Sequence, residues 1–352
     1  MKKWLIYCMC MASTSVFAQE TIKLTAGKHN DFGLTYNLPN TMADINIQVT
    51  KVTATAGPYY KYAEKYLGVQ EIVTENMQYW EMNDIQIKPV GISNPEETYL
   101  IEFRSGSAPT MYLNENGNLL SINTEPQASS VADNKKQPAT KKNESTTPSY
   151  SVLSEEQLTA GSTAKMAEMA AKQIYRIRES RLNLATGDVD QLPADGESFK
   201  LIMKQLDDQE AALTAMFLGT IKKEQISKTI RINPAEKTGK SMLFRFSKYL
   251  GIVDNENLSG VPVYLNTEIT EDLRPQAEEA KKKKKHKGVT YNVPGKVKLT
   301  ISTQNKTLTS AEFGVAQFGY NMQFPTNMFD DKKAPAKAIF SPETGAILEI
   351  LQ

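Results

Sequence analysis

The sequence predicts an α+β protein in which two related antiparallel β-rich modules flank a long antiparallel two-helix hairpin. Three observations lead to this fold class: apolar residues alternate with polar ones near both ends of the chain, they recur every three or four positions in its middle, and a seven-residue motif occurs twice. We therefore divide the chain into 1–18 (signal peptide), 19–122 (N-terminal β-rich module with a short helix), 123–150 (disordered linker), 151–219 (helical hairpin) and 220–352 (C-terminal β-rich module with a charged insert at 271–287).

The first eighteen residues have the pattern of a signal peptide. Two lysines open a mostly apolar stretch that ends at Phe17, and Ala18 suits a signal peptidase. This stretch is too short to span about 30 Å of hydrocarbon comfortably, so we expect an exported protein with no transmembrane segment in the mature chain. Cys8 and Cys10 would leave with the signal, and the mature chain would hold neither a disulfide nor a thiolate metal site.

The first module is expected to be a sheet with one small helix. Leu34, Tyr36 and Leu38 alternate with polar residues, and a similar alternation follows after Pro39 and Asn40, where we predict a turn. Pro58 suits a first helical position. The expected elements of this module are strands at 34–38 and 45–49, a helix at 58–68, and strands at 99–103 and 119–122.

The middle of the chain is expected to be a linker followed by the hairpin. Residues 123–150 are almost all polar, Ala or Pro, a composition that cannot bury enough apolar surface to fold. Ser154 and Gln157 form a capping box from which we predict one long helix. A second helix is predicted from Asp195, with Gly219 as its end.

The last part of the chain is expected to be an antiparallel sandwich or sheet, because short alternating segments are separated by turn residues. The insert at 271–287 is strongly charged and is predicted to be a solvent-facing helix, so its lysine run does not predict a nucleic-acid site. Lys plus Arg number 41 and Asp plus Glu 40, a balance that provides no general field for nucleic acid. The expected strands are 229–232, 242–247, 261–265, 289–293, 297–301, 315–318, 338–340 and 347–351.

The repeated motif indicates that the two β-rich modules are related. Residues 33–39 read GLTYNLP and residues 288–294 read GVTYNVP, with five of seven positions identical. The closing segments are also similar, since an Ala-Pro pair precedes LLSI at 119–122 and another precedes ILEI at 347–350. Two copies are too few for a solenoid.

Aromatic residues around the first helix provide the candidate ligand-binding site. Aromatic faces bind the apolar faces of sugar rings, although such a stripe more often packs a helix on its sheet. The candidates are Tyr59, Tyr60, Tyr62, Tyr66 and Trp80, with Tyr79 beside the last. A second candidate, an anion-binding group, consists of Arg176, Arg178 and Arg181, for which a salt-bridged outer face is the favoured alternative.

The sequence contains no catalytic motif with a specific pattern. His29 and His286 lie in polar surroundings, and Asp188 opens a segment that departs from the calcium-loop template at Leu192 and Pro193. We therefore expect no metal site and no cofactor. Adjacent acids at 96–97, 207–208 and 330–331 leave carboxylate-based glycoside hydrolysis open.

The chain resembles an uncharacterised exported family from Bacteroides-type bacteria, domain of unknown function family 4831. The similarity covers most of the chain that would remain after cleavage. The segments that resemble the family are YNLP at 36–39, AGPYYKYAEKYLG at 56–68, IYRIRESR at 174–181, DGE at 195–197 and MFLG at 216–219. The resemblance implies a Gram-negative periplasmic or outer-membrane-associated location and supplies no active-site residues.

The sequence favours a non-catalytic binding or interaction module of the cell envelope over an enzyme. The expected partner is a glycan, a peptide or an envelope protein, and association of identical chains through the hairpin is open. The alternative function is a carboxylate-based hydrolase acting on glycans.

Overall fold

A computed structural model describes residues 21–23, 33–101, 109–126, 152–189, 196–275, 288–325, 328–329 and 335–351. It is an α+β protein with antiparallel sheets, as predicted. The expected signal peptide, both histidines, most of the linker, most of the charged insert and the predicted cap Asp195 lie outside the described residues.

Sheet A contains the two longest strands. Its order is β1 (Thr21–Lys23), β3 (Met77–Ile101), β2 (Leu34–Thr55) and β6 (Thr220–Ile232). The predicted turn at Pro39 and Asn40 is wrong, because β2 runs through both residues with only a register shift between Asn37 and Pro39. β6 pairs with β2 only from Ala43 onward, so the missing N–H of Pro39 removes no hydrogen bond to β6.

Sheet C packs against part of sheet A to form a sandwich. Its order is β11 (Thr307–Phe324), β10 (Val289–Ser302), β9 (Val261–Glu271), β7 (Gly239–Ser247) and β8 (Gly251–Val253). The two strands expected at 289–293 and 297–301 are one strand, β10, with a register shift between Val293 and Gly295. The shared core includes Ile45 and Ile47 from β2 and Leu299 and Ile301 from β10.

Sheet B is small and joins parts of the chain that are far apart in sequence. Its order is β13 (Ile347–Leu351), β12 (Lys337–Phe340), β5 (Leu119–Ile122) and β4 (Met111–Leu113). β5 and β12 pair through Ile122 opposite Ala338 and Ser121 opposite Ile339. A second core below this sheet contains Tyr36, Tyr99 and Phe340.

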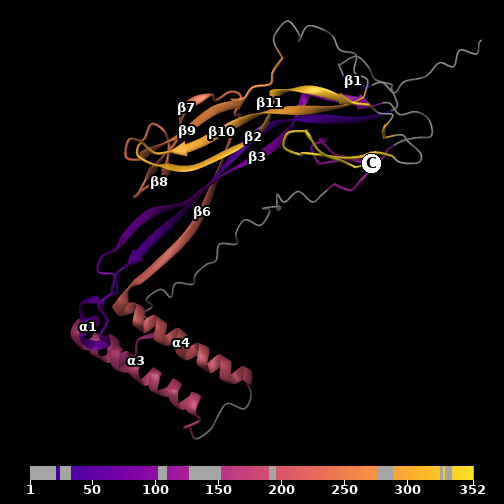
Figure 1. Cartoon of the computed structure of the whole chain (residues 1–352). Coiled ribbons are helices and arrows are strands. Elements are labelled where there is room, and N and C mark those ends of the chain that lie inside the picture. Colours follow the sequence, from indigo (N-terminus) through magenta and orange to yellow (C-terminus); the bar gives the residue numbers. More distant parts are fainter. Residues whose placement is uncertain are drawn as a thin grey trace, which may run out of the picture.

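The helices form a separate unit. It contains η1 (Tyr60–Tyr62), α1 (Ala63–Leu67), α2 (Glu155–Leu158), α3 (Thr163–Thr186) and α4 (Gly196–Leu218). β2, β3 and β6 extend beyond the sandwich and hold this unit at their far end (Figure 1). No helix in the described part of the chain is long and apolar enough to cross a membrane.

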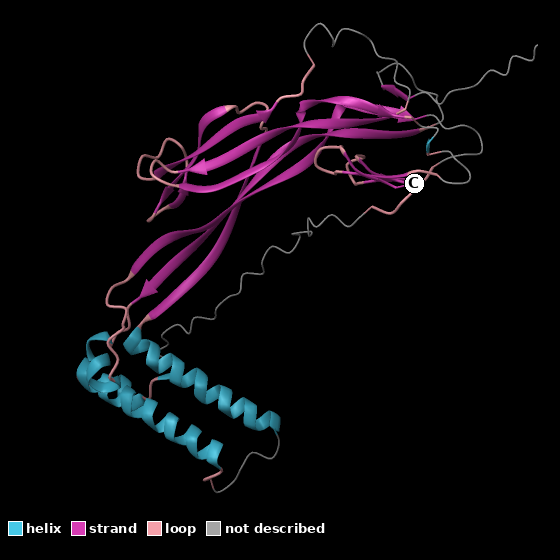
Figure 2. Ribbon diagram, viewed as in Figure 1, coloured by secondary structure: helices cyan, strands magenta, loops and turns pink. Residues whose placement is uncertain are grey.

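The long helix predicted from Ser154 is two helices. The capping box of Ser154 and Gln157 is present, but α2 ends after one turn. Ser162 then caps α3 by accepting a hydrogen bond from the Lys165 N–H. The break follows from Gly161, since glycine loses more backbone entropy in a helix than any other residue. α3 and α4 lie antiparallel (Figure 2). Accordingly, the ion pairs between them join a later residue of α3 to an earlier residue of α4: Arg178 pairs with Glu210 and Arg181 with Asp207.

The two copies of the repeated motif make the same contacts. The Asn37 N–H donates to Gly117 O at 2.8 Å, and the Asn292 N–H donates to Gly345 O at 3.1 Å. The side-chain amides repeat the pattern, with Asn37 Nδ2 3.2 Å from Asn116 O and Asn292 Nδ2 2.7 Å from Thr344 O. Both acceptor glycines have positive φ, 76° at Gly117 and 71° at Gly345. Each motif therefore docks the turn of a short hairpin onto the start of a long strand.

Candidate binding surface on the helical unit

The segment that carries the tyrosines is fixed against the end of α4. The Tyr59 N–H donates to Met216 O at 2.8 Å. A Cβ on Gly57 would lie 2.2 Å from the same oxygen, so only glycine allows this approach of two backbones. Gly68 ends α1 in the left-handed conformation at φ 67°, as the sequence predicted.

Tyr59 belongs to the core of the helical unit. Its side chain is 2% exposed and its ring centroid lies 5.4 Å from that of Phe217. Tyr59 packs with Ala63, Ile174 and Phe217 in this core. The structure therefore assigns this residue to packing, the alternative weighed above, and not to an exposed surface.

The other tyrosines of this segment are partly exposed. Tyr62 and Tyr66 lie one helical turn apart with ring centroids 6.2 Å apart, and Tyr60 precedes them in η1. A fourth ring comes from α3, because the Tyr175 hydroxyl donates to Tyr66 O at 2.8 Å. We call Tyr60, Tyr62, Tyr66 and Tyr175 the tyrosine surface.

Sequence reasoning missed Tyr175 as a site residue. Its side chain is 50% exposed although its neighbours Ile174 and Ile177 are buried. The apolar stripe of α3 contains those two isoleucines, and Tyr175 lies beside the stripe. A large aromatic residue outside the buried face of a helix is the sequence signal that could have identified Tyr175.

Cations lie over three rings of the tyrosine surface. Lys61 Nζ is 5.8 Å from the Tyr60 centroid and Lys65 Nζ is 5.1 Å from the Tyr66 centroid. The Arg178 guanidinium carbon is 5.6 Å from the Tyr175 centroid. Each geometry is that of a cation–π contact at an exposed site. The surface consequently presents aromatic rings together with positive charge.

Trp80 does not join the tyrosine surface. It lies on β3 and packs against the sandwich core. Its backbone N–H donates to Lys248 O at 2.7 Å, and Lys51 Nζ lies 5.9 Å from its ring centroid. A Cβ on Gly251 would lie 2.9 Å from the indole, so this ring covers the start of β8. The structure therefore separates Trp80 from the candidates on the helical unit.

Two of the three candidate arginines are held by carboxylates. Arg181 lies 2.7 Å from Asp207 and 2.8 Å from Glu210, and Arg178 lies 2.6 Å from Glu210. The hydrogen bond from Arg181 to Asp207 contributes most to the raised pKa of Arg181. Arg176 is exposed and has no ion pair with any residue that the structure describes. Arg178 and Arg181 thus fit the alternative of a salt-bridged outer face.

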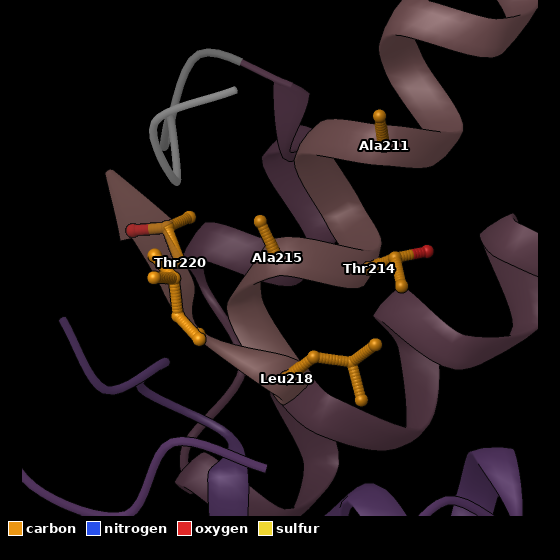
Figure 3. Close-up of a pocket in the computed structure, with 7 residues that line it drawn as sticks. Ala211, Thr214, Ala215, Leu218 and Thr220 are labelled. Carbon is orange, nitrogen blue, oxygen red and sulfur yellow. The ribbon is translucent and has the colours of Figure 1, made fainter. Parts of the chain in front are cut away.

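An open groove lies where α4 meets β6. Its volume is about 290 Å³, and α4 and the start of β6 both contribute to its walls (Figure 3). The Thr214 hydroxyl is buried and has no hydrogen-bond partner among the described residues. The lining residues are Ala211, Thr214, Ala215, Leu218, Gly219, Thr220 and Ile221.

The candidate acids are placed in different surroundings. Glu97 bonds to Tyr99 of β3 and to Asn321 of β11, whereas Asp207 pairs with Arg181 on the helical unit. The acids at 330–331 lie outside the described residues. Within the part of the chain that the structure describes, no three His, Cys, Asp or Glu side chains are grouped so as to hold a metal ion.

Comparison with known proteins gives one match. A family described as "Domain of unknown function (DUF4831)" matches residues 32–348. No curated protein and no solved structure matches the chain. The matched region spans both copies of the repeated motif and the helical unit.

Proposed function

The chain belongs to the DUF4831 family, and we propose that it is a non-catalytic interaction protein of the cell envelope whose tyrosine surface binds an acidic glycan. The observation that carries this proposal is the grouping of four partly exposed tyrosines with cations over three of their rings. An envelope location is supported by the signal-peptide pattern that ends at Ala18.

The rings suit the apolar faces of sugars. Tyr62 and Tyr66 pack partly on the core of the helical unit, which restricts their side chains before any ligand binds. A restricted aromatic side chain loses little entropy on binding, and tyrosine adds a hydroxyl for the polar rim of a sugar ring. The unit's position at the end of three extended strands leaves this surface away from the sandwich (Figure 2).

The charges favour an acidic sugar over a neutral one. Lys61, Lys65 and Arg176 are exposed, and none of them forms an ion pair with a described residue. A carboxylate on the ligand would gain a charge-assisted hydrogen bond from such a group while a neighbouring ring stacks. Lysine side chains are flexible, so those over Tyr60 and Tyr66 can move aside for a ring.

Thermal unfolding of the full chain tests this function. A galacturonic acid oligosaccharide, which carries carboxylates, should raise the melting temperature by several degrees at saturating concentration, because it binds the native state. A neutral galactose oligosaccharide of the same length should raise it less. Tyr62→Ala should remove the shift, whereas Tyr249→Ala, which truncates a 71% exposed tyrosine on the sandwich, should retain it.

Two outcomes would redirect the proposal. No shift with the acidic oligosaccharide, and none with other acidic glycans, would contradict sugar binding. Shortening of the oligosaccharide during incubation would support the hydrolase alternative, and Glu and Asp substitutions would then identify the acids that act.

A further inference from the structure

β2 and β10 carry the two copies of the motif in stacked sheets and run in the same direction. Tyr36 bonds to Thr290, and Pro39 O accepts a hydrogen bond from Asn292 Nδ2 at 3.4 Å. The contacts thus follow the same residue order on both strands. A displacement of the second copy by about one sheet spacing, roughly 10 Å, preserves this direction. A two-fold axis along the strands would preserve it too, but it would also bury equivalent residues equally, which is not the case here. A displacement, unlike a two-fold rotation, leaves one unmatched face at each end.

The contact between the copies is made by Tyr36 and Thr290. The Tyr36 hydroxyl donates to Thr290 O at 3.0 Å and accepts from the Thr290 N–H at 2.7 Å. Both residues are buried, at 1% and 0% exposure. By motif position, Tyr291 is the equivalent of Tyr36 and Thr35 the equivalent of Thr290. Tyr291 is partly exposed and Thr35 is exposed, so neither equivalent is covered in the same way.

The two hairpins of sheet B are equivalent to each other in the same way as the two motif copies. Hairpin β4–β5 pairs Met111 with Ile122, and hairpin β12–β13 pairs Ala338 with Ile350. Two pairs further along, each hairpin has a register shift, before Leu113 in one and before Phe340 in the other. β4 is thus the equivalent of β12, and β5 the equivalent of β13.

The pairing of β5 with β12 joins the two hairpins, and its equivalent pair of edges is unpaired among the described strands. Ile122 lies opposite Ala338, and both are buried, at 0% and 1% exposure. Their equivalents are Ile350, which is 41% exposed, and Met111, which is partly exposed. β13 and β4 form the two edges of the sheet. β13 also exposes Leu348 (65%) and Leu351 (43%), an apolar edge of the kind that pairs with another chain.

We propose that copies of this chain associate head to tail, with β13 and Tyr291 of one copy against β4 and Thr35 of the next. The contact repeats the one that already joins the two halves of each chain. A second copy is the occupant that fits, because every copy carries both halves of the contact and the within-chain pairing defines the register, Ile350 opposite Met111. A contact of this heterologous type propagates into a chain or closes into a ring.

Cysteine cross-linking of the full chain tests the register. In a Cys8→Ser, Cys10→Ser background, Met111→Cys and Ile350→Cys are made singly and together. Directly opposed residues on antiparallel strands have Cβ atoms about 4.5–5.5 Å apart, and a small shift of the two edge strands brings them to the disulfide range of about 3.5–4.5 Å, so mild oxidation can join them. The double variant should give a ladder of covalent oligomers. A mixture of the two single variants should give dimers and nothing longer, because each chain then has one reactive edge.

Several outcomes would overturn the proposal. Single variants that cross-link alone as well as they do in the mixture would indicate a two-fold contact or random collision. A matched control, Leu201→Cys mixed with Ile350→Cys, reports random collision, since Leu201 is 67% exposed on the helical unit. Independently of cysteine chemistry, Ile350→Lys should weaken self-association measured by sedimentation at least ten-fold with little change in melting temperature. A chain that stays monomeric at every concentration, with no mixed dimers, would contradict head-to-tail association.

Discussion

Tyr36 and Tyr291 occupy the same position of the repeated motif, yet Tyr36 is buried with its hydroxyl bonded to the Thr290 backbone, whereas Tyr291 is partly exposed with its hydroxyl 3.7 Å from Met322 Sδ. The difference arises because β10 covers the first copy of the motif and no described strand covers the second in the same way. Equivalent tyrosines of the two motif copies therefore contribute unequally to stability.

Removing the two hydroxyls should have unequal effects on stability. Tyr36→Phe leaves the Thr290 N–H and carbonyl without this partner in a buried position, which should lower the free energy of unfolding by about 1–3 kcal/mol. Tyr291→Phe should change it by less than about 0.5 kcal/mol, as at most surface positions. Urea unfolding of the two variants measures the difference, and equal losses would contradict the assigned burial.

Stability should decline at alkaline pH. Burial raises the pKa of the Tyr36 hydroxyl above its usual value, so the folded chain holds this proton when the unfolded chain has lost it. The unfolded state then binds fewer protons, and the free energy of unfolding falls as pH rises above about 10, by about 1.4 kcal/mol per pH unit for one group. Urea unfolding between about pH 8 and pH 11 should show this slope, and Tyr36→Phe should reduce it. An unchanged slope in the variant would assign the effect to other groups, such as Tyr99, whose pKa burial also raises.

A methyl group at position 57 should destabilise the protein, because the backbone of Gly57 lies against the backbone of Met216. Gly57→Ala places a Cβ 2.2 Å from Met216 O and should lower the free energy of unfolding by about 1–3 kcal/mol through overpacking. Gly161→Ala is the matched control, because a Cβ added there would have no atom of a described residue within 4 Å apart from its chain neighbours. The change in the free energy of unfolding should be small or stabilising. Thermal unfolding of both variants, followed by circular dichroism, separates the two cases.

Lysines of the tyrosine surface should matter for binding more than the paired arginines do. Lys65→Gln removes a charge over the Tyr66 ring and should weaken binding of the galacturonic acid oligosaccharide several-fold. Arg181→Gln removes a charge that Asp207 and Glu210 already engage and should change the affinity by less than about two-fold. Titration of the two variants with the same oligosaccharide checks this order, and a larger loss in Arg181→Gln would reverse the assignment.

Local features were predictable where a single residue determines the backbone. Gly68 and Gly219 end helices at positive φ, and Ser154 with Gln157 forms the capping box, all as expected from sequence. Long strands were not predictable, because Pro39 is tolerated in β2 only where β6 does not pair with that strand. That condition depends on β6, which lies far from Pro39 in sequence.

The candidate site was only partly predictable for the same reason. The sequence gives no reason to separate Tyr59 from Tyr62 and Tyr66, which follow it at helical spacing. In the structure, contact with Phe217 of α4 buries Tyr59 but not the other two. Trp80 follows the tyrosines closely in sequence, yet β3 carries it to the sandwich. Tyr175 joins the surface through a hydrogen bond to Tyr66, 109 residues earlier, which no local pattern reports.

Calorimetric titration of the full chain with the galacturonic acid oligosaccharide is the sharpest test of glycan binding, with Tyr62→Ala and Tyr249→Ala titrated alongside. We expect binding that weakens as salt rises, because exposed charges are screened beyond about 10 Å at 0.1 M ionic strength. We also expect at least a ten-fold loss of affinity in Tyr62→Ala and none in Tyr249→Ala. Binding that is unchanged in Tyr62→Ala, or equally strong for the neutral galactose oligosaccharide, would contradict a tyrosine surface that recognises acidic glycans.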